Sequence, residues 1–179
     1  GSVLIDGHEL ADSREVYPQR DFAEVRAFAD GRGMTLPEYV RYYEPDIYPY
    51  LETVWQVMKE SVERGLEASG VLGGGLNLER KARVLYGENA KFELSLIHAN
   101  RKVSAEALAV AEENAANGTV ITAPTCGSAG IVPAVLYYMH RDCGVSEREI
   151  VDALAVAGVV GNVVKQNASI SGAECGCQA

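Results

Sequence analysis

Apolar residues recur at steps of three and four along most of the chain, which is the pattern of helices that bury one face. The clearest run predicts a long helix that follows Asp46, which acts as its cap, and that stops before Gly70. Its expected core-facing residues are Ile47, Tyr50, Leu51, Val54, Trp55, Met58, Val62 and Leu66. We interpret this stripe as core packing and not as a cofactor-binding surface.

Local start and stop signals predict further helices. Two Ser/Thr-x-x-Glu capping boxes place helix starts at Thr35 and Ser146. Asn77 and Ser104 are expected to cap two other helices, and the Asn117-Gly118 pair is expected to end the second of these. The chain from start to end therefore reads as a succession of helices joined by short loops.

The second half of the chain contains the most apolar predicted helix. Residues 150–166 follow the second capping box, and their side chains are small or apolar almost all round. Before them, a helix over 129–141 has Pro133 in or near its first turn, and the β-branched residues 119–125 are either a short strand or an extended lead-in. We expect one all-α domain over residues 1–179, with a buried central apolar helix and short glycine- and serine-rich loops.

Composition and charge exclude several classes of protein. Of the 179 residues 47% are hydrophobic, and 25 acidic against 16 basic residues give a formal net charge of -9. This charge disfavours nucleic-acid binding and attachment to acidic membrane surfaces. No apolar run approaches the roughly 20 residues that span a bilayer, and the first residues lack the order of a secretory signal. We therefore expect a cytoplasmic protein.

The four cysteines, Cys126, Cys143, Cys175 and Cys177, do not form a C-x-x-C pair. In a chain of this length without an export signal, cysteines are more often reduced thiols, metal ligands or catalytic groups than disulfides. Cys143 follows an apolar helix and precedes a glycine, which favours a structural role.

Three loops stand out as candidates for chemistry. The glycine-rich residues 70–77 permit close backbone approach to a ligand or serve as a flexible connector. Residues 123–130 offer the hydroxyls of Thr125 and Ser128 and free N–H groups at a helix start, which suits a carboxylate. Simple N-capping is the alternative role for both hydroxyls.

The third loop, residues 167–179, directly follows the apolar helix and is hard to explain as packing. Its small polar residues, one carboxylate and two thiols could give hydrogen bonds, a proton-transfer group and metal ligands to one centre. These residues include Asn167, Ser169, Ser171, Glu174, Cys175 and Cys177. An exposed loop carboxylate is the simpler description of the glutamate.

Two strings, TAPTCGSAGIVPAVL and NASISGAECGCQA, resemble the α region of the iron–sulfur-dependent L-serine dehydratases, also called L-serine ammonia-lyases. The upstream strings VMKESVERGLEASGVLGGGLNLERKAR and ALAVAEENAANG are similar to that family too. The resemblance covers roughly residues 54–179, and the first 45 or so residues match no family pattern.

The resemblance implies an enzyme that converts L-serine to pyruvate and ammonia with a [4Fe-4S] cluster and without pyridoxal phosphate. An open iron of the cluster would act as a Lewis acid on the β-hydroxyl. Of the three family ligands only Cys177 lies in this chain, so we expect these 179 residues by themselves to lack both cluster and activity. Cys126 and Cys175 do not fall at ligand positions of the family.

The resemblance also suggests roles for the other candidates. Asn167, Ser169 and Ser171 would orient the substrate or hydrogen-bond cluster sulfur, and Thr125 and Ser128 would bind the substrate carboxylate. No general base is assigned: the base is expected on the companion β domain or subunit of the family. The three histidines, His8, His98 and His140, fall outside the motif strings and are expected to be structural or exposed. Self-association into a homo-oligomer is also expected.

Two alternatives remain at this point. A lyase for another small amino acid, such as threonine or cysteine, would differ only in pocket shape. A non-catalytic helical interaction module is the other alternative, although it does not require so dense a set of polar motifs.

Overall fold

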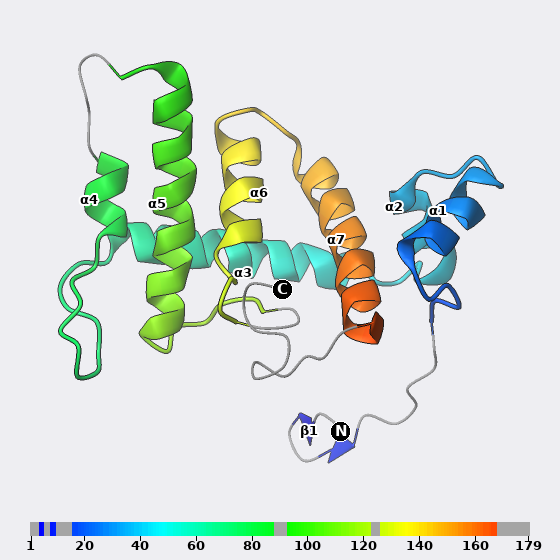
Figure 1. Ribbon diagram of the computed structural model, residues 1–179, viewed down its shortest axis with the longest axis horizontal. Helices are drawn as coiled ribbons and strands as arrows, with labels where there is room; N and C mark the ends of the chain where they lie inside the picture. The colour runs from blue at the N-terminus through cyan, green and yellow to red at the C-terminus, as the bar shows by residue number, and fades with distance from the viewer. Residues whose placement is uncertain (1–3, 6–7, 10–15, 88–92, 123–125, 168–179) are drawn as a thin grey trace.

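The computed structural model describes residues 4–5, 8–9, 16–87, 93–122 and 126–167, and its fold is all-α, as predicted (Figure 1). The described helices are α1 Phe22–Asp30, α2 Leu36–Tyr43, α3 Tyr48–Glu67, α4 Ala82–Gly87, α5 Ser95–Ala115, α6 Ile131–Arg141 and α7 Glu147–Asn167. Two short strands, β1 Leu4–Ile5 and β2 His8–Glu9, form an antiparallel pair. None of the described helices is both long and apolar enough to cross a membrane.

Helix α3 is the element around which the fold is built. Helices α4, α5, α6 and α7 all contact it, and Figure 1 shows them standing across α3 in chain order. The main core joins side chains of α3, α5, α6 and α7. Its fully or almost fully buried members are Trp55, Met58, Val62, Val110, Tyr137, Ile150, Val151 and Leu154.

A second core, rich in aromatic rings, joins α1 and α2 to α7. Tyr17 stacks on Tyr39, with 5.6 Å between ring centroids, and the same buried cluster contains Ala155 and Val159 of α7. The Arg41 guanidinium pairs with the Asp152 carboxylate and so ties α2 to α7. The predicted capping box at the start of α2 is confirmed. The N-terminal helices therefore brace α7 on the side away from α6.

The end of α3 before Gly70 is as predicted, but its start differs from the prediction. Its N-cap is Ile47, no side chain caps the helix, and Asp46 does not have the expected role. Pro49 in the first turn has no N–H, which leaves one donor fewer to satisfy. Tyr50 lies within the apolar stripe but is 63% exposed, so its assignment to the core was wrong.

The segments around α4 and α5 also correct two capping predictions. Asn77 has φ 49° and lies in the loop between Val71 and Glu79, which form an isolated antiparallel bridge. Helix α4 begins only at Ala82. The Glu112 side chain of α5 caps α4 instead, accepting hydrogen bonds from two backbone N–H groups at its start. Ser104 lies inside α5, whose N-cap is Leu94, ten residues before the predicted cap. At α4, the Glu112 carboxylate thus takes the capping role that was predicted for Asn77.

The end of α5 and the start of α7 are as predicted. Asn117 has φ 60°, and Gly118 N–H donates to the Glu113 carbonyl at 2.8 Å, which is the hydrogen bond of a Schellman motif. Ser146 and Glu149 form the second capping box. Residues 119–122 are not a strand, so the first interpretation of this β-branched segment is wrong for its described part. The described residues bury one face of α7, whereas Val160 on another face is 43% exposed.

Candidate functional site

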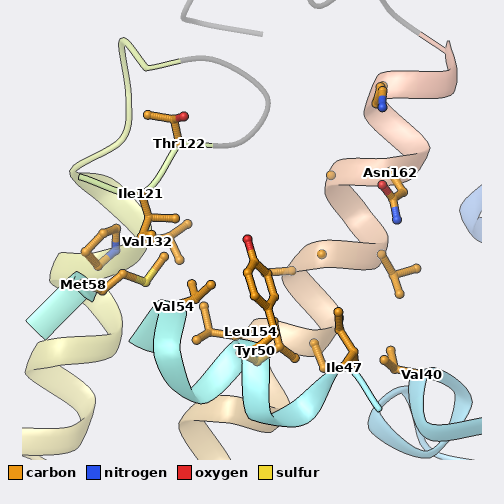
Figure 2. Close-up of a pocket in the computed structure, with 18 of the residues that line it drawn as sticks. Val40, Ile47, Tyr50, Val54, Met58, Ile121, Thr122, Val132, Leu154 and Asn162 are labelled. Atoms are coloured by element: carbon orange, nitrogen blue, oxygen red, sulfur yellow. The ribbon is translucent and has the colours of Figure 1, made fainter. Parts of the chain in front are cut away.

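A pocket of about 650 Å³ lies between α3, α7 and the segment that leads into α6 (Figure 2). Apolar side chains such as Ile47, Val54 and Leu154 form its floor, and Figure 2 shows them along α3 and the adjoining part of α7. Its volume and its position between helices are typical of a small-molecule site.

Small residues on α7 keep this pocket open. Ala157, Gly158 and Gly161 line it, and a Cβ added to either glycine would meet no atom within 4 Å. The Cβ of a larger residue at either glycine would therefore take up pocket space. The open space beside α7 therefore reflects the small size of these residues.

Polar groups enter the pocket from three elements. Thr122 and Ser128 come from the segment before α6, Tyr50 from α3, and Asn162 and Lys165 from α7. Figure 2 shows the Tyr50 hydroxyl pointing away from α3 into the space between the Thr122 segment and α7. A small ligand in this space would meet hydroxyl groups, one amide and one ammonium over an apolar floor.

The start of α6 forms one wall of the pocket. Gly130 is the N-cap of α6 and makes no side-chain cap hydrogen bond, and the Ser128 side chain does not cap the helix. The Ser128 backbone carbonyl instead accepts from Ile131 N–H at 3.1 Å. The N-capping alternative for Ser128 is therefore not what the structure has. Its exposed hydroxyl lies beside the positive end of the α6 dipole.

At another edge of the pocket a tyrosine and a carboxylate are already paired. The Tyr17 hydroxyl donates to the Glu44 carboxylate. Burial and then this hydrogen bond raise the pKa of Tyr17 far above its usual value, so the phenol stays protonated. Glu44 thus already has a hydrogen-bond donor within the protein.

The sequence-predicted site residues fall in different places. Ser128 lines the pocket, as a ligand-binding residue must. Asn167 does not: its amide donates to the carbonyls of Arg20 and Val163, each at 2.9 Å, and so joins the end of α7 to the segment before α1. Thr125, Ser169, Ser171 and Cys177 lie outside the described residues.

Sequence reasoning missed Tyr50, Thr122, Asn162 and Lys165, all of which line the pocket. One signal was present for Lys165, because it follows Gly161 by four residues and Gly158 by seven and so shares their helix face. Tyr50 was missed because it falls at the spacing of the apolar core residues of α3, although its side chain is exposed. The glycine-rich loop at 70–77 does not contribute to the pocket lining.

The described residues do not supply ligands for an iron–sulfur cluster. They contain no group of three or more His, Cys, Asp or Glu side chains placed to hold a metal ion. Cys126 and Cys143 are exposed free thiols that flank α6, a helix about 16 Å long. They therefore lie too far apart to bind one cluster together.

Two of the three histidines have structural partners, as expected. His140 Nδ1 lies 2.7 Å from the Val145 carbonyl and packs edge-on against Trp55. His98 lies 3.0 Å from the Glu93 carboxylate. Neither ring lines the pocket.

The fold and pocket together define an all-α domain with a pocket of mixed polar and apolar lining between its helices. The sequence profile described as serine dehydratase alpha chain matches residues 10–179. The chain belongs to this family, and the match begins well before residue 54, where the resemblance of the motifs begins.

Individual relatives agree with this assignment. Over 99% of this chain it is 41% identical to an L-serine dehydratase of Streptomyces coelicolor and 38% identical to L-serine dehydratase 1 of Escherichia coli. Over 75% of the chain it is 36% identical to the probable L-serine dehydratase alpha chain of Bacillus subtilis. The chain spans 40%, 42% and 44% of the lengths of these three relatives, respectively.

Proposed function

We propose that this chain forms part of the substrate-binding region of an L-serine dehydratase, which eliminates water from L-serine to give pyruvate and ammonia. The names of its relatives support the substrate, and the pocket supports a small polar ligand. Because the chain spans 40% of the first of these relatives, the reaction is a property of the complete protein. The alpha-chain name of the family and of the Bacillus subtilis relative supports a β domain or subunit as the partner.

The observation that carries this proposal is the uncapped start of α6 in the pocket wall. At this start Ile131 N–H donates to the Ser128 carbonyl and Pro133 has no N–H, so the N–H groups of Gly130 and Val132 are those left without a partner among the described residues. Such unpaired groups attract anions together with the helix dipole. The Ser128 hydroxyl stands beside them and is not used as a cap. An amino-acid carboxylate is the group in L-serine that matches this wall.

Elimination requires removal of the α-proton and departure of hydroxide from the β-carbon. The described residues contribute substrate binding to this reaction, because they hold the carboxylate at α6 and surround the rest of the molecule with an apolar floor. That floor keeps bulk water away and strengthens the polar contacts above it. Thr125, Ser169 and Ser171 are proposed to extend the polar wall, and the general base is proposed to come from the β region.

The prediction of a [4Fe-4S] cluster in this protein depends on Cys177 as a ligand, and Cys177 lies outside the described residues. Among the described residues alone, no group of three or more possible metal ligands occurs. The cluster and the absence of pyridoxal phosphate accordingly remain predictions from the resemblance of the motifs.

Turnover by the complete protein tests the proposed function. L-Serine, L-threonine and L-cysteine are compared under anaerobic conditions, with the 2-oxo acid and ammonia measured separately. We expect pyruvate and ammonia in equal amounts from L-serine, and the highest kcat/KM for this substrate. A higher kcat/KM for L-threonine or L-cysteine would identify that amino acid as the substrate in place of L-serine. Release of no 2-oxo acid from any of the three would refute the proposal.

A matched pair of variants connects turnover to the pocket. Ser128→Ala removes one hydroxyl from the pocket wall and is expected to lower kcat/KM for L-serine about 10-fold, which corresponds to one lost hydrogen bond. Ser104→Ala makes the same change on the exposed surface of α5 and is expected to leave kcat/KM unchanged. Equal values for the two variants would remove Ser128 from the site.

A further inference from the structure

Lys165 occupies a distinctive place in the last turn of α7. It lines the pocket and lies on the same helix face as Gly158 and Gly161, seven and four residues earlier. Because those two positions carry no side chains, the lysine stem has open space along the pocket wall. The ammonium is therefore able to reach into the pocket instead of extending only into solvent.

The charges around the pocket leave this ammonium uncompensated. Within the part of the chain that the structure describes, Lys165 makes no ion pair and no side-chain hydrogen bond. It is the single cationic side chain among the described residues of the lining, and the single carboxylate there, Glu44, is engaged by the Tyr17 hydroxyl. An anionic ligand would thus find one available positive charge in this space.

The opposite wall offers groups for the same anion. Ser128 and the uncapped start of α6 line the pocket across from α7. A carboxylate has two oxygens, and it is best held when a charged donor and neutral donors share them. The pocket brings both kinds of donor to one space from two separate helices.

We propose that Lys165 binds the α-carboxylate of the amino-acid substrate, opposite Ser128 and the start of α6. This inference rests on the proposed function and names a binding residue that the sequence motifs did not indicate. A positive charge at this position favours binding of α-amino acids over their amides, which have no carboxylate.

A structural role for Lys165 makes different predictions. A cation in the last turn of a helix also stabilises the helix dipole, and this effect is weak at an exposed position. Loss of that role would lower thermal stability and would affect all substrates alike. Loss of a carboxylate contact would instead act on the substrate that carries the carboxylate.

The experiment compares L-serine with L-serinamide, which keeps the amine, the α-proton and the hydroxyl but has no carboxylate. Both compounds are assayed as substrates of the complete protein. Binding of L-serinamide is also measured as competitive inhibition of L-serine turnover, and binding of either compound by calorimetry. Three variants are used: Lys165→Met, Lys165→Arg and, as a control matched in charge and length, Lys81→Met in the segment before α4. Lys81 is exposed and does not line the pocket.

For Lys165→Met we expect kcat/KM for L-serine to fall about 10- to 100-fold, mainly through KM, which is the range for one lost charge-assisted hydrogen bond. The kcat/KM or inhibition constant for L-serinamide is expected to change less than about 3-fold, so the preference of the enzyme for L-serine over L-serinamide is largely lost. Lys165→Arg should recover most of the loss, and Lys81→Met should resemble the unaltered protein.

Two failures are distinguishable. If the unaltered protein deaminates L-serine but Lys165→Met changes serine and serinamide by the same factor, or changes neither, the inference about Lys165 is wrong and the proposed function stands. If the unaltered protein releases no pyruvate from L-serine, the proposed function fails and takes the inference with it.

Discussion

Gly65 of α3 lies directly against the backbone of Ala109 in α5, so closely that a Cβ on Gly65 would come within 2.3 Å of the Ala109 carbonyl oxygen. Gly130, the N-cap of α6, approaches α5 in the same way, and its Cβ would come within 2.3 Å of the Ala107 carbonyl oxygen. Two glycines therefore let α3 and the start of α6 lie close against one helix. These contacts fix the distance between two walls of the pocket.

The first prediction concerns the crossing of α3 and α5. Gly65→Ala is expected to destabilise the protein by about 1–3 kcal/mol, because the methyl group forces the two backbones apart. This cost outweighs the gain of up to about 1 kcal/mol that alanine brings to a helix interior. Chemical denaturation with urea, followed by circular dichroism, measures the difference.

Gly158→Ala serves as the control for this prediction. It makes the same chemical change inside a helix, but its Cβ meets no atom within 4 Å. We expect it to be neutral or to stabilise the fold by up to about 1 kcal/mol. Equal stabilities for the two variants would contradict the close crossing of α3 and α5.

Features set by neighbouring residues were predictable from the sequence. The capping boxes at Thr35 and Ser146 and the stop at Asn117 are confirmed, because a few adjacent residues supply all the hydrogen bonds involved. The all-α class is confirmed for the same reason, since the apolar period of each helix is a local property. Such features do not depend on how the helices meet.

Features set by contacts between distant segments were not predictable. The cap of α4 comes from Glu112, 31 and 30 residues away from the two N–H groups it accepts, so no local pattern could show it. Tyr50 has the period of a core residue, but the small residues of α7 leave the space beside it empty. Ser128, a candidate from the sequence, lines the pocket, whereas Lys165 became a candidate only when α7 was placed opposite the start of α6.

The second prediction uses the open face of α7. Gly161→Leu places a side chain in the pocket, where a Cβ meets no described atom within 4 Å. The fold is expected to keep its thermal stability, whereas kcat/KM for L-serine in the complete protein is expected to fall at least about 10-fold because the ligand space is filled. Gly161→Ala should have a kcat/KM between those of the unaltered protein and Gly161→Leu. Full activity of a stably folded Gly161→Leu protein would show that this pocket does not take the substrate.

The third prediction concerns a buried carboxyl group on α5. Glu106 is fully buried, and neither of its carboxyl oxygens has a hydrogen-bond partner among the described residues. Burial, and next the Asp142 charge, raise its pKa to about 7, against opposing effects of Lys102 and Arg141. The folded protein therefore holds a proton on Glu106 at pH values at which the unfolded chain has released it.

The sign of the pH dependence follows from this raised pKa. The stability contribution of protonated Glu106 is complete below the ordinary pKa of 4.5 and is lost as the pH rises through about 7. A shift of this size corresponds to about 3 kcal/mol. Glu106→Gln is expected to match the unaltered protein at about pH 4.5 and to be more stable at about pH 8. The free energy of unfolding, measured across this pH range, tests this.

An exposed glutamate provides the control for Glu106. Glu52→Gln removes an equivalent charge from the surface of α3 and should leave the shape of the pH profile unchanged. If Glu106→Gln loses the same stability at every pH, the carboxyl group makes a structural contact that glutamine cannot replace, and the titration is not its main effect.

The last prediction addresses the cluster through the cysteines. In the complete protein, anaerobically reconstituted with iron and sulfide, Cys177→Ala is expected to lose the cluster absorbance and the bound iron, because a neutral methyl group cannot replace a thiolate ligand. Cys126→Ser and Cys143→Ser are expected to retain both, since these exposed thiols flank α6 and cannot share one cluster. Loss of the cluster in Cys126→Ser, with retention in Cys177→Ala, would move the ligand to the loop before α6. In that case the metal would lie against the wall that we assign to the substrate carboxylate, and the two roles could not both belong there.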